Sequence, residues 1–253
     1  MFEIAFVRKP GKSLVNGISE SNQGQPDYEK ALKQHEEYKT TLRKCGLKII
    51  ELEPDEQFPD STFVEDTAVI TRDMAILANP APSSRKDEVL RISQELKKHW
   101  NILESIKEPG KLEGGDVMQI DMHFYVGISE RTNEEGARQF DAIVRKYGYT
   151  SSSMKINNLL HLKTGVNYLG DKYLLMKNNF LKEEHFERFN IINVSEKEAY
   201  AANSLRINEY VFVPDGYPET KEKIEKEGFK TMVVNLSEFK KLDGGLSCLS
   251  LRV

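Results

Sequence analysis

A helix, a stop signal and a short β-rich run follow one another repeatedly along this chain. Residues 27–44 place apolar side chains at helical spacing, Gly46 supplies the stop, and residues 47–52 alternate as a strand. Repetition of such a unit predicts an architecture in which each helix covers a small sheet. The pattern occurs five times, and its other units begin at Asp87, at the capping residue Thr132, and at Glu183 and Glu219.

Further short strands are predicted between these helices, at residues 75–77, 101–103, 124–127, 173–176 and 210–213. Strands plus one helix therefore recur with a period of about 40 to 50 residues. Units of this size bury their apolar faces against their neighbours, so we expect an α/β fold whose modules close into a ring around one axis. The rival architecture, a doubly wound open sheet, favours a Gly-x-Gly-x-x-Gly loop after an early strand, and none occurs there.

Composition limits the classes of function. With 253 residues, 39% of them hydrophobic, the chain can bury a substantial core, and without a linker we expect residues 1–253 to form a single domain. A net charge of -4 offers no electrostatic footprint for nucleic acid or an anionic membrane, and suits a small cationic substrate better. No apolar run approaches a membrane span, and residues 1–8 read as a strand rather than a signal peptide, so we expect a cytoplasmic protein.

Cys248 is the strongest candidate for a chemical role. It follows Gly244-Gly245, and a glycine bend lets the backbone bring a thiol close to a substrate. The alternative is a buried thiol packed in a final strand, residues 248–253. The other cysteine, Cys45, falls near the end of the first helix, and two cysteines cannot form a disulfide framework, so we expect both thiols to be reduced.

His161 and Glu113 could complete a nucleophilic site with this thiol. Glu113 precedes Gly114-Gly115, so its carboxylate leaves a tight bend and could orient a histidine. The alternatives are a hydrogen-bonded core histidine and an ordinary turn carboxylate. No His-x-x-x-His or Cys-x-x-Cys pair occurs, so we expect no metal and no other cofactor. The remaining histidines lack such neighbours and are interpreted as structural or solvated: His35, His99, His123 and His185.

Carboxylates and arginines provide candidate contacts for a substrate. Asp60, Glu65 and Asp66 lie within seven residues, and a carboxylate in an apolar context is unfavourable unless it meets a cation. A planar guanidinium matches paired acceptors, so the cluster predicts a seat for an arginine-like ligand. Arg85 and Arg131 each precede a predicted helix and could clamp an α-carboxylate, although a loop arginine is more commonly solvated.

Taken together and in this order, the segments resemble the dimethylarginine dimethylaminohydrolases, or dimethylargininases, which are guanidine-modifying enzymes. The resemblance spans the whole chain. It implies a five-module pseudo-symmetric α/β propeller with a central site, and hydrolysis of Nω-methylated arginine to citrulline and a methylamine. Its carriers are residues 58–61, 63–66, 84–85, 113–116, 124–127, 131–133, 160–163, 200–203 and 243–248.

The resemblance also implies roles for individual residues. Cys248 would attack the guanidinium carbon to form a covalent thiouronium, His161 would protonate the leaving amine and later deprotonate a water, and Glu113 would orient His161. Residues 12–26 would close as a flap that excludes water. The binding roles are Glu65 and Asp66 for the guanidinium, Asp60 with backbone carbonyls near Ile18 and Leu242 for the α-ammonium, and Arg85 with Arg131 for the α-carboxylate.

The acidic cluster also bears on the state of the thiol. Negative surroundings raise a thiol pKa, and the sequence places no lysine beside Cys248. We therefore expect Cys248 to be mostly protonated at neutral pH until a bound guanidinium lowers its pKa.

Two other functions stay open at this stage. Arginine deiminases use the same triad and release ammonia, but they usually carry an inserted helical domain for which this chain has no room. A non-catalytic protein that captures arginine-like amino acids would keep the anionic seat, although the intact set of Cys248, His161 and Glu113 argues against it. The preference among dimethylated, monomethylated and unmethylated arginine is not decided by the sequence, and neither is the formation of a homodimer.

Overall fold

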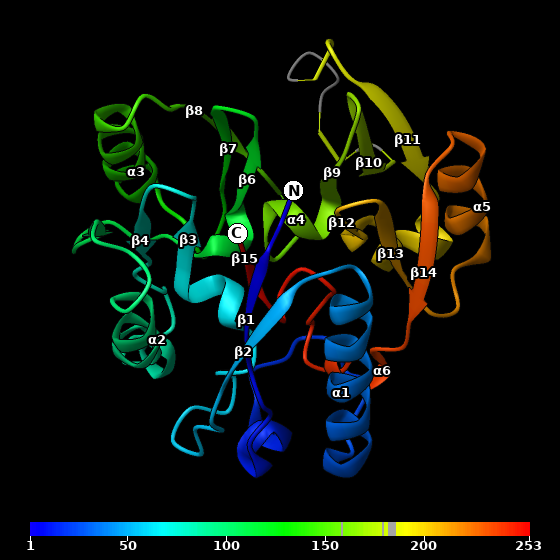
Figure 1. The fold of residues 1–253 in the computed structure, drawn as a ribbon, viewed down its shortest axis with the longest axis horizontal. Coiled ribbons are helices and arrows are strands. Elements are labelled where there is room, and N and C mark those ends of the chain that lie inside the picture. Colours follow the sequence, from blue (N-terminus) through cyan, green and yellow to red (C-terminus); the bar gives the residue numbers. More distant parts are fainter. Residues whose placement is uncertain (158, 179, 182–185) are drawn as a thin grey trace.

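The computed structural model describes residues 1–157, 159–178, 180, 181 and 186–253. These residues form an α/β fold with five three-stranded sheets, and Figure 1 shows the sheets arranged around the region where the two chain ends are drawn. The predicted ring of α/β modules is therefore confirmed. The longer helices lie on the outside of the ring: α1 (Tyr28–Lys44), α2 (Glu88–Leu96), α3 (Glu134–Lys146) and α5 (Pro218–Lys226).

Every sheet follows the same plan, in which the first strand is antiparallel to the second and the third is parallel to the second. A parallel neighbour requires a crossover, which α1, α2, α3 and α5 provide in four of the sheets. Four sheets, in the order of the chain, are β3 (Ala68–Ile70), β4 (Ala75–Leu77) and β5 (Leu103–Ser105); β6 (Val117–Ile120), β7 (His123–Ile128) and β8 (Thr150–Lys155); β9 (Val166–Gly170), β10 (Tyr173–Lys177) and β11 (Asn190–Val194); and β12 (Leu205–Ile207), β13 (Tyr210–Pro214) and β14 (Lys230–Val234).

The crossover between β10 and β11 contains residues 182–185, which are not among the described residues. The helix that the sequence predicts from Glu183 therefore falls partly outside them, as does His185. The described residues 186–189 form turns and bends that lead into β11.

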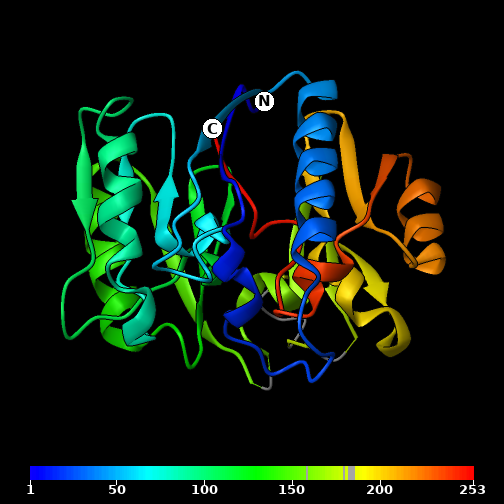
Figure 2. The ribbon, with the colours of Figure 1, turned by 90° about the horizontal axis from the view of Figure 1, so that it is seen from below.

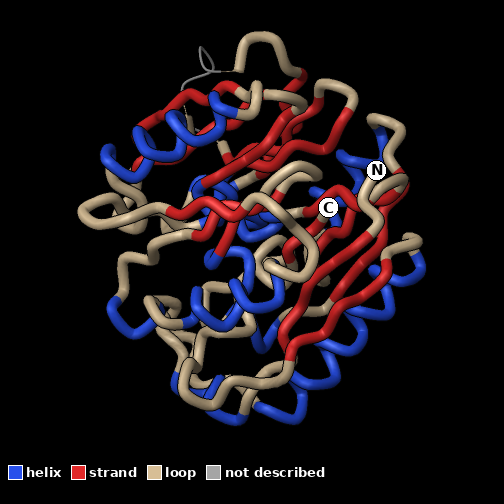
Figure 3. The backbone as a smooth tube through the Cα atoms, turned by 60° about the vertical axis from the view of Figure 1, so that its left-hand side comes forward, coloured by secondary structure: helices blue, strands red, loops and turns tan. Residues whose placement is uncertain are grey.

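The fifth sheet closes the ring by combining both ends of the chain. β15 (Leu251–Arg252) pairs antiparallel with β1 (Ile4–Arg8), which pairs parallel with β2 (Lys48–Leu52). Figures 2 and 3 show the two chain ends side by side, and the Glu3 N–H donates to the carbonyl of Val253 at 2.7 Å. The C-terminal strand thus supplies the first strand of a module whose other two strands come from the N-terminal residues.

Helix boundaries largely follow the local sequence signals. Asp27 caps α1 with its side chain, and Gly46, which follows that helix, has a φ of 89° that favours glycine. The cap of α3 is Asn133, so the prediction of Thr132 as the capping residue is wrong by one position. The Thr132 hydroxyl instead accepts the backbone N–H of Glu113, which removes it from the helix end.

One predicted strand, and the final strand considered as the alternative for Cys248, begin later along the chain than the sequence indicates. The run at residues 101–103 contributes only Leu103 to β5, because α2 is followed by Trp100, whose indole donates a hydrogen bond to the carbonyl of Thr71. The run at 248–253 contributes only β15. Cys248 therefore lies in the turn before the strand and not within it.

A short turn precedes the first strand of every sheet, and these turns carry the candidate functional residues. Successive turns pack against one another around the axis: η2 contacts η4, η4 contacts α4, and α4 contacts η6. Residues that are far apart in the sequence meet there because each module brings the same part of its own chain inward. The turns are η2 (Val64–Thr67), η4 (Gly114–Asp116), α4 (Leu162–Gly165), η6 (Glu196–Asn203) and residues 246–249.

Apolar side chains fill the space between each outer helix and its sheet. In the module that contains α3, Phe140 meets Phe124 of β7 edge to face, with ring centroids 5.2 Å apart. Such packing leaves the polar residues of the inner turns free to form a site. Over the described ranges, no helix is long and apolar enough to cross a membrane.

Candidate active site

The turns at the axis bring His161 and Glu113 together. Glu113 stands immediately before η4 and His161 immediately before α4, and Nε2 of His161 lies 2.8 Å from a carboxylate oxygen of Glu113. Both side chains are buried, and Glu113 has no exposed surface. A carboxylate at this distance orients an imidazole and favours its protonated form. The structure thus places the predicted acid–base residue beside its predicted orienting carboxylate.

Two glycines permit this close approach. A Cβ atom on Gly114 would lie 1.9 Å from the carbonyl oxygen of Glu65, and a Cβ on Gly115 would lie 2.7 Å from the ring of His161. Neither position has room for a side chain. The Gly115 N–H also donates to the carboxylate of Asp66 at 3.2 Å. The glycine bend recognised in the sequence therefore lets η4 pack directly against the segments that carry Asp66 and His161.

The charges around His161 favour the imidazolium. Burial lowers the pKa of His161, but the negative charges of Asp66 and Asp116 and the hydrogen bond to Glu113 outweigh burial and raise that pKa to about 9. The nearest oxygen of Asp66 lies 3.8 Å from Nε2 of His161. These charges therefore favour the protonated form of His161 at neutral pH.

Arg85 holds Asp66 in place from a buried position. One terminal nitrogen of its guanidinium lies 2.7 Å from a carboxylate oxygen of Asp66, and the guanidinium also bonds Glu88 and the backbone carbonyls of Asp60 and Phe63. The side chain is only 4% exposed, so the alternative of a solvated loop arginine does not hold for Arg85. Most of its donors are used inside the protein, because Glu88 of the following helix faces it at i+3.

Cys248 is partly buried, and the Gly245 N–H points toward its sulfur at 3.4 Å. Burial raises the pKa of Cys248 to about 12, with further contributions from Glu65 and Asp66, whereas Gly245 and Lys163 act in the opposite direction. The direction agrees with the expectation of a protonated thiol. One detail was not expected from the sequence: the fold brings Lys163 close enough to lower the pKa of Cys248 slightly against the larger effect of burial.

A buried hub centred on Glu65 joins three segments of the site. One carboxylate oxygen of Glu65 accepts from Lys163 at 2.6 Å and from Arg252 at 2.9 Å, and the other accepts from the Ser247 hydroxyl at 2.6 Å. These partners are close in sequence to the candidate catalytic residues: Ser247 adjoins Cys248, and Lys163 follows the segment of His161. The Glu65 carboxylate is thus engaged by three protein donors.

Asn203 extends this hub to the turn of a further module. Its amide donates to the Lys163 carbonyl at 2.8 Å and accepts from the Ser247 N–H at 3.0 Å. No role was predicted from the sequence for Asn203, Lys163, Ser247 or Arg252. Lys163, Asn203 and Ser247 nevertheless lie in segments on which the family resemblance rests. Each of these segments precedes the first strand of a module, and this shared position is the sequence signal that could have identified them.

The residues expected to hold an amino acid group also gather. The backbone N–H of Ile18 donates to the Asp60 carboxylate at 3.0 Å. A Cβ on Gly17 would lie 3.0 Å from both that carboxylate and the Leu242 side chain, so these segments are in close contact. Burial raises the pKa of Asp60, although the charge of Arg85 opposes this. Ile18, Asp60 and Leu242 therefore lie together, as the resemblance implied.

Arg131 lies between this group and the triad. Its guanidinium is 3.6 Å from a carboxylate oxygen of Glu113, and its side chain is 14% exposed. The separation is longer than that of a strong charge-assisted pair, which leaves donors of Arg131 available to a ligand. Of the two predicted clamp arginines, Arg131 is the more accessible.

The proposed flap contains a short 3₁₀ helix, η1 (Lys12–Asn16), and then irregular backbone. Its tip is tied to the segment that leads to Cys248, because the hydroxyls of Ser19 and Ser21 each donate to the Lys241 carbonyl at 2.6 Å. The Glu20 N–H donates to the carboxylate of Asp243 at 2.7 Å. These contacts hold residues 19–21 against the segment of Lys241 and Asp243.

Asp66, Glu113 and His161 also form a potential metal-binding set, since one ligand atom from each lies within 4.8 Å of the others. Within the described parts of the chain, this is the only such group that contains at least three His, Cys, Asp or Glu residues. Its members already satisfy one another, with Nε2 of His161 on Glu113 and Arg85 on Asp66. Hydrogen bonds and ion pairs thus hold these three side chains in place.

Comparison with known proteins identifies the family. The family model described as N,N dimethylarginine dimethylhydrolase, eukaryotic, matches residues 13–250. The N(G),N(G)-dimethylarginine dimethylaminohydrolase of Pseudomonas aeruginosa is 45% identical over 253 residues, which is 100% of both chains.

Solved structures agree with this match. A mutant of the Pseudomonas aeruginosa protein complexed with citrulline superposes with a TM-score of 0.98 at 44% identity and covers 100% of both chains. A histidine-to-glycine variant of a dimethylarginine dimethylaminohydrolase, solved as an adduct with S-methyl-L-thiocitrulline, superposes equally well, with a TM-score of 0.98 at 44% identity and 100% coverage of both chains. The chain described here belongs to the dimethylarginine dimethylaminohydrolase family and is a hydrolase of that family.

Proposed function

We propose that this protein hydrolyses dimethylarginine and monomethylarginine to citrulline and the corresponding methylamine. The observation that carries the proposal is the buried His161–Glu113 pair beside Asp66, which sets an imidazolium and a carboxylate at one place on the axis. A citrulline complex and a thiocitrulline adduct of relatives at 44% identity support the same ligand class. The proposed reaction needs only side chains and water.

The proposed chemistry has two halves. With the guanidinium bound, the Cys248 thiol loses its proton to solvent, and the resulting thiolate adds to the guanidinium carbon. The bond from that carbon to the methylated nitrogen breaks as His161 gives its proton to the departing amine. The neutral His161 then takes a proton from a water, whose oxygen adds to the carbon of the covalent thiouronium. The carbon–sulfur bond breaks, and citrulline and the thiol of Cys248 are released. Glu113 keeps the imidazole oriented throughout.

Substrate positioning follows the charges of the site. Asp66 attracts the guanidinium, while Asp60 and the backbone carbonyls near Ile18 and Leu242 take the α-ammonium. The Glu65 carboxylate, which the resemblance also assigned to the guanidinium, is already engaged by Lys163, Arg252 and Ser247. Closure of residues 12–26 over the ligand would exclude water from the thiolate. Arg131 and Arg85 clamp the α-carboxylate. We also propose that residues 1–253 act as one domain, because β15 completes the sheet of β1 and β2.

The direct test measures citrulline together with dimethylamine, methylamine and ammonia from the three corresponding arginines. We expect citrulline and methylamines in equal amounts from the methylated substrates. Ammonia released from unmethylated arginine at a comparable or higher kcat/KM would identify an arginine deiminase instead. Binding of these arginines without any citrulline would identify a non-catalytic capture protein.

Arg131→Ala should raise KM for dimethylarginine roughly ten- to hundredfold, since a charge-assisted hydrogen bond to a carboxylate contributes about 1.5–3 kcal/mol. For an analogue without the α-carboxylate, KM should change little. Arg131→Lys keeps the charge and should recover part of the loss. Equal losses for both substrates would show that Arg131 is structural.

Arg85→Ala should lower the free energy of unfolding, because it leaves Asp66 and Glu88 buried without their cation.

The pH dependence of Cys248 alkylation tests how the nucleophile is activated. Because the pKa of Cys248 is raised to about 12, the rate with a small neutral reagent should still be rising at pH 9 in the free protein. A non-hydrolysable guanidinium ligand that leaves the sulfur accessible should shift this profile to lower pH. The experiment uses Cys45→Ala, so that Cys248 is the thiol observed. A profile already flat above pH 7 without ligand would point instead to a resting thiolate paired with His161.

A further inference from the structure

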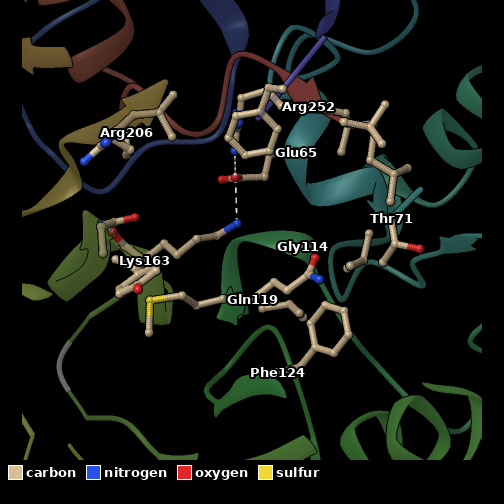
Figure 4. A pocket seen from close by; sticks show the side chains of 18 of the residues that line it. Glu65, Thr71, Gly114, Gln119, Phe124, Lys163, Arg206 and Arg252 are labelled. Carbon is tan, nitrogen blue, oxygen red and sulfur yellow. Dashed lines mark hydrogen bonds and ion pairs between the residues drawn. The ribbon is translucent and has the colours of Figure 1, made fainter. Parts of the chain in front are cut away.

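A cavity of about 810 Å³ lies inside the ring, apart from Cys248 and His161. It is lined by residues of β3, β6, β9, β12 and β15, the first strand of every sheet, and it includes both chain ends at its mouth. Figure 4 shows this cavity with Glu65, Lys163 and Arg252 at one side. The volume is within the range of about 300–1,000 Å³ typical of small-molecule sites.

Four basic side chains line the cavity against three acidic ones, so positive charge is in excess by one: Arg72, Lys163, Arg206 and Arg252 against Glu65, Asp121 and Asp171. Lys163 and Arg252 both pair with the single carboxylate of Glu65. The other hydrogen bonds of Arg252 go to neutral oxygens of Ser247 and Ser250, which do not cancel its charge. Two cations against one carboxylate leave a net positive charge at this wall.

Arg206 adds a second positive point on another wall of the cavity. Its guanidinium donates to the carbonyls of Leu169, at 2.6 Å, and Asn208. Its acidic neighbour Asp171 is 3.6 Å away and has a side chain that is 75% exposed, so this pair is weak. Backbone carbonyls orient the guanidinium without neutralising it.

Apolar groups line the cavity between these charges, among them Val69, Val117, Phe124 and Leu205. A carbon skeleton can use this surface, whereas a hydrated inorganic anion cannot. We propose that the cavity is a second small-molecule site, which binds an organic polycarboxylate between the Lys163–Arg252 wall and Arg206. This site is distinct from the one proposed for methylated arginine, and its existence does not depend on the proposed hydrolysis.

The residues that form the positive wall of the second site also contact the segments that carry Cys248 and His161. Glu65 bonds Ser247, the neighbour of Cys248, and Lys163 lies two residues after His161. Lys163 also lowers the pKa of Cys248. A carboxylate that draws the Lys163 ammonium toward the cavity weakens this effect, so occupancy should make the Cys248 thiolate harder to form.

Citrate is a suitable probe, and isothermal titration calorimetry of the full chain measures its binding. Saturating citrulline is included so that citrate cannot bind in the proposed arginine site. Arg206→Gln should weaken citrate binding roughly tenfold or more, and Arg206→Lys should recover part of it. Gln119, an exposed residue that lines the cavity, provides a second pair that does not depend on buried contacts. Gln119→Glu should weaken binding several-fold and Gln119→Lys should strengthen it, with citrulline formation in the absence of citrate unchanged in both.

Citrate should also slow alkylation of Cys248 by a neutral reagent at a fixed pH, and Gln119→Glu should require more citrate for the same effect. An unchanged citrate affinity in the variants at both Arg206 and Gln119 would overturn the proposed site. Inorganic phosphate bound as tightly as citrate would overturn its assignment to organic polycarboxylates. Normal binding with an unchanged alkylation rate would overturn the coupling to Cys248. The citrate titrations of the Arg206 and Gln119 variants and the alkylation rates need no turnover, so they test the second site even where no citrulline is formed.

Discussion

Cys248→Ser should lower kcat by about 10³-fold or more, because a serine hydroxyl is a far weaker nucleophile than a thiol and nothing adjacent would ionise it. Steady-state citrulline formation measures the loss, and circular dichroism shows that the variant is folded. Retention of more than a tenth of the original kcat by a folded Cys248→Ser protein would exclude Cys248 as the nucleophile.

Cys45→Ala is the matched control. Cys45 is a free, buried thiol at the end of α1, and its sulfur lies 3.8 Å from that of Met232. Its removal takes a few apolar contacts from the core and should lower the free energy of unfolding by about 1 kcal/mol, with kcat nearly unchanged. A large loss of kcat in this variant would show that turnover responds to packing and not to the Cys248 thiol alone.

His161→Ala should lower kcat by about 10²–10⁴-fold, because the leaving amine then departs without a positioned proton donor. The two halves of the reaction should respond differently. With a substrate such as S-methyl-L-thiocitrulline, whose leaving group needs less protonation, the Cys248 thiolate should still add to the central carbon as methanethiolate leaves. The thiouronium adduct should accumulate because no base activates water. Mass spectrometry of the intact protein detects this adduct.

His123→Ala is the control for the loss of an imidazole. The ring of His123 bonds the hydroxyls of Thr150 and Ser152, and no carboxylate contact is recorded for it among the described residues. Its substitution should leave kcat unchanged. A His161→Ala protein that turns over methylated arginine normally, or that fails to form any adduct while folded, would contradict the role proposed for His161.

Much of the fold could be predicted because it depends on local signals. The helical spacing in residues 27–44, the positive-φ glycines and the alternating strands are properties of short windows, and their repetition predicted the ring. The errors arose where a residue finds its partner elsewhere. Thr132 is a good helix cap in isolation, but its hydroxyl accepts the Glu113 N–H, so Asn133 caps the helix instead.

The candidate site could be predicted only in part, for the same reason. The glycine bends and acidic cluster marked Cys248, Glu113 and Asp66 as unusual, and the resemblance arranged them into one reaction. Nothing local reveals that the Glu65 carboxylate meets Lys163 and Arg252, which are 98 and 187 residues away in the sequence. The number of donors on a buried carboxylate is a property of the closed ring, and it becomes visible only in three dimensions.

The pairing of β15 with β1 means that the two chain ends could be joined and the chain opened elsewhere. Since the Glu3 N–H and the Val253 carbonyl are 2.7 Å apart, a short linker could join the ends without moving the sheet. The chain could then be opened at another surface turn, such as that at Gly228 between α5 and β14. A circular permutant of this kind would contain the same five modules, with Cys248 about 20 residues from the new N-terminus near Gly228. The order of the residues along the chain is thus separable from their order around the axis, and it is the order around the axis that the site requires.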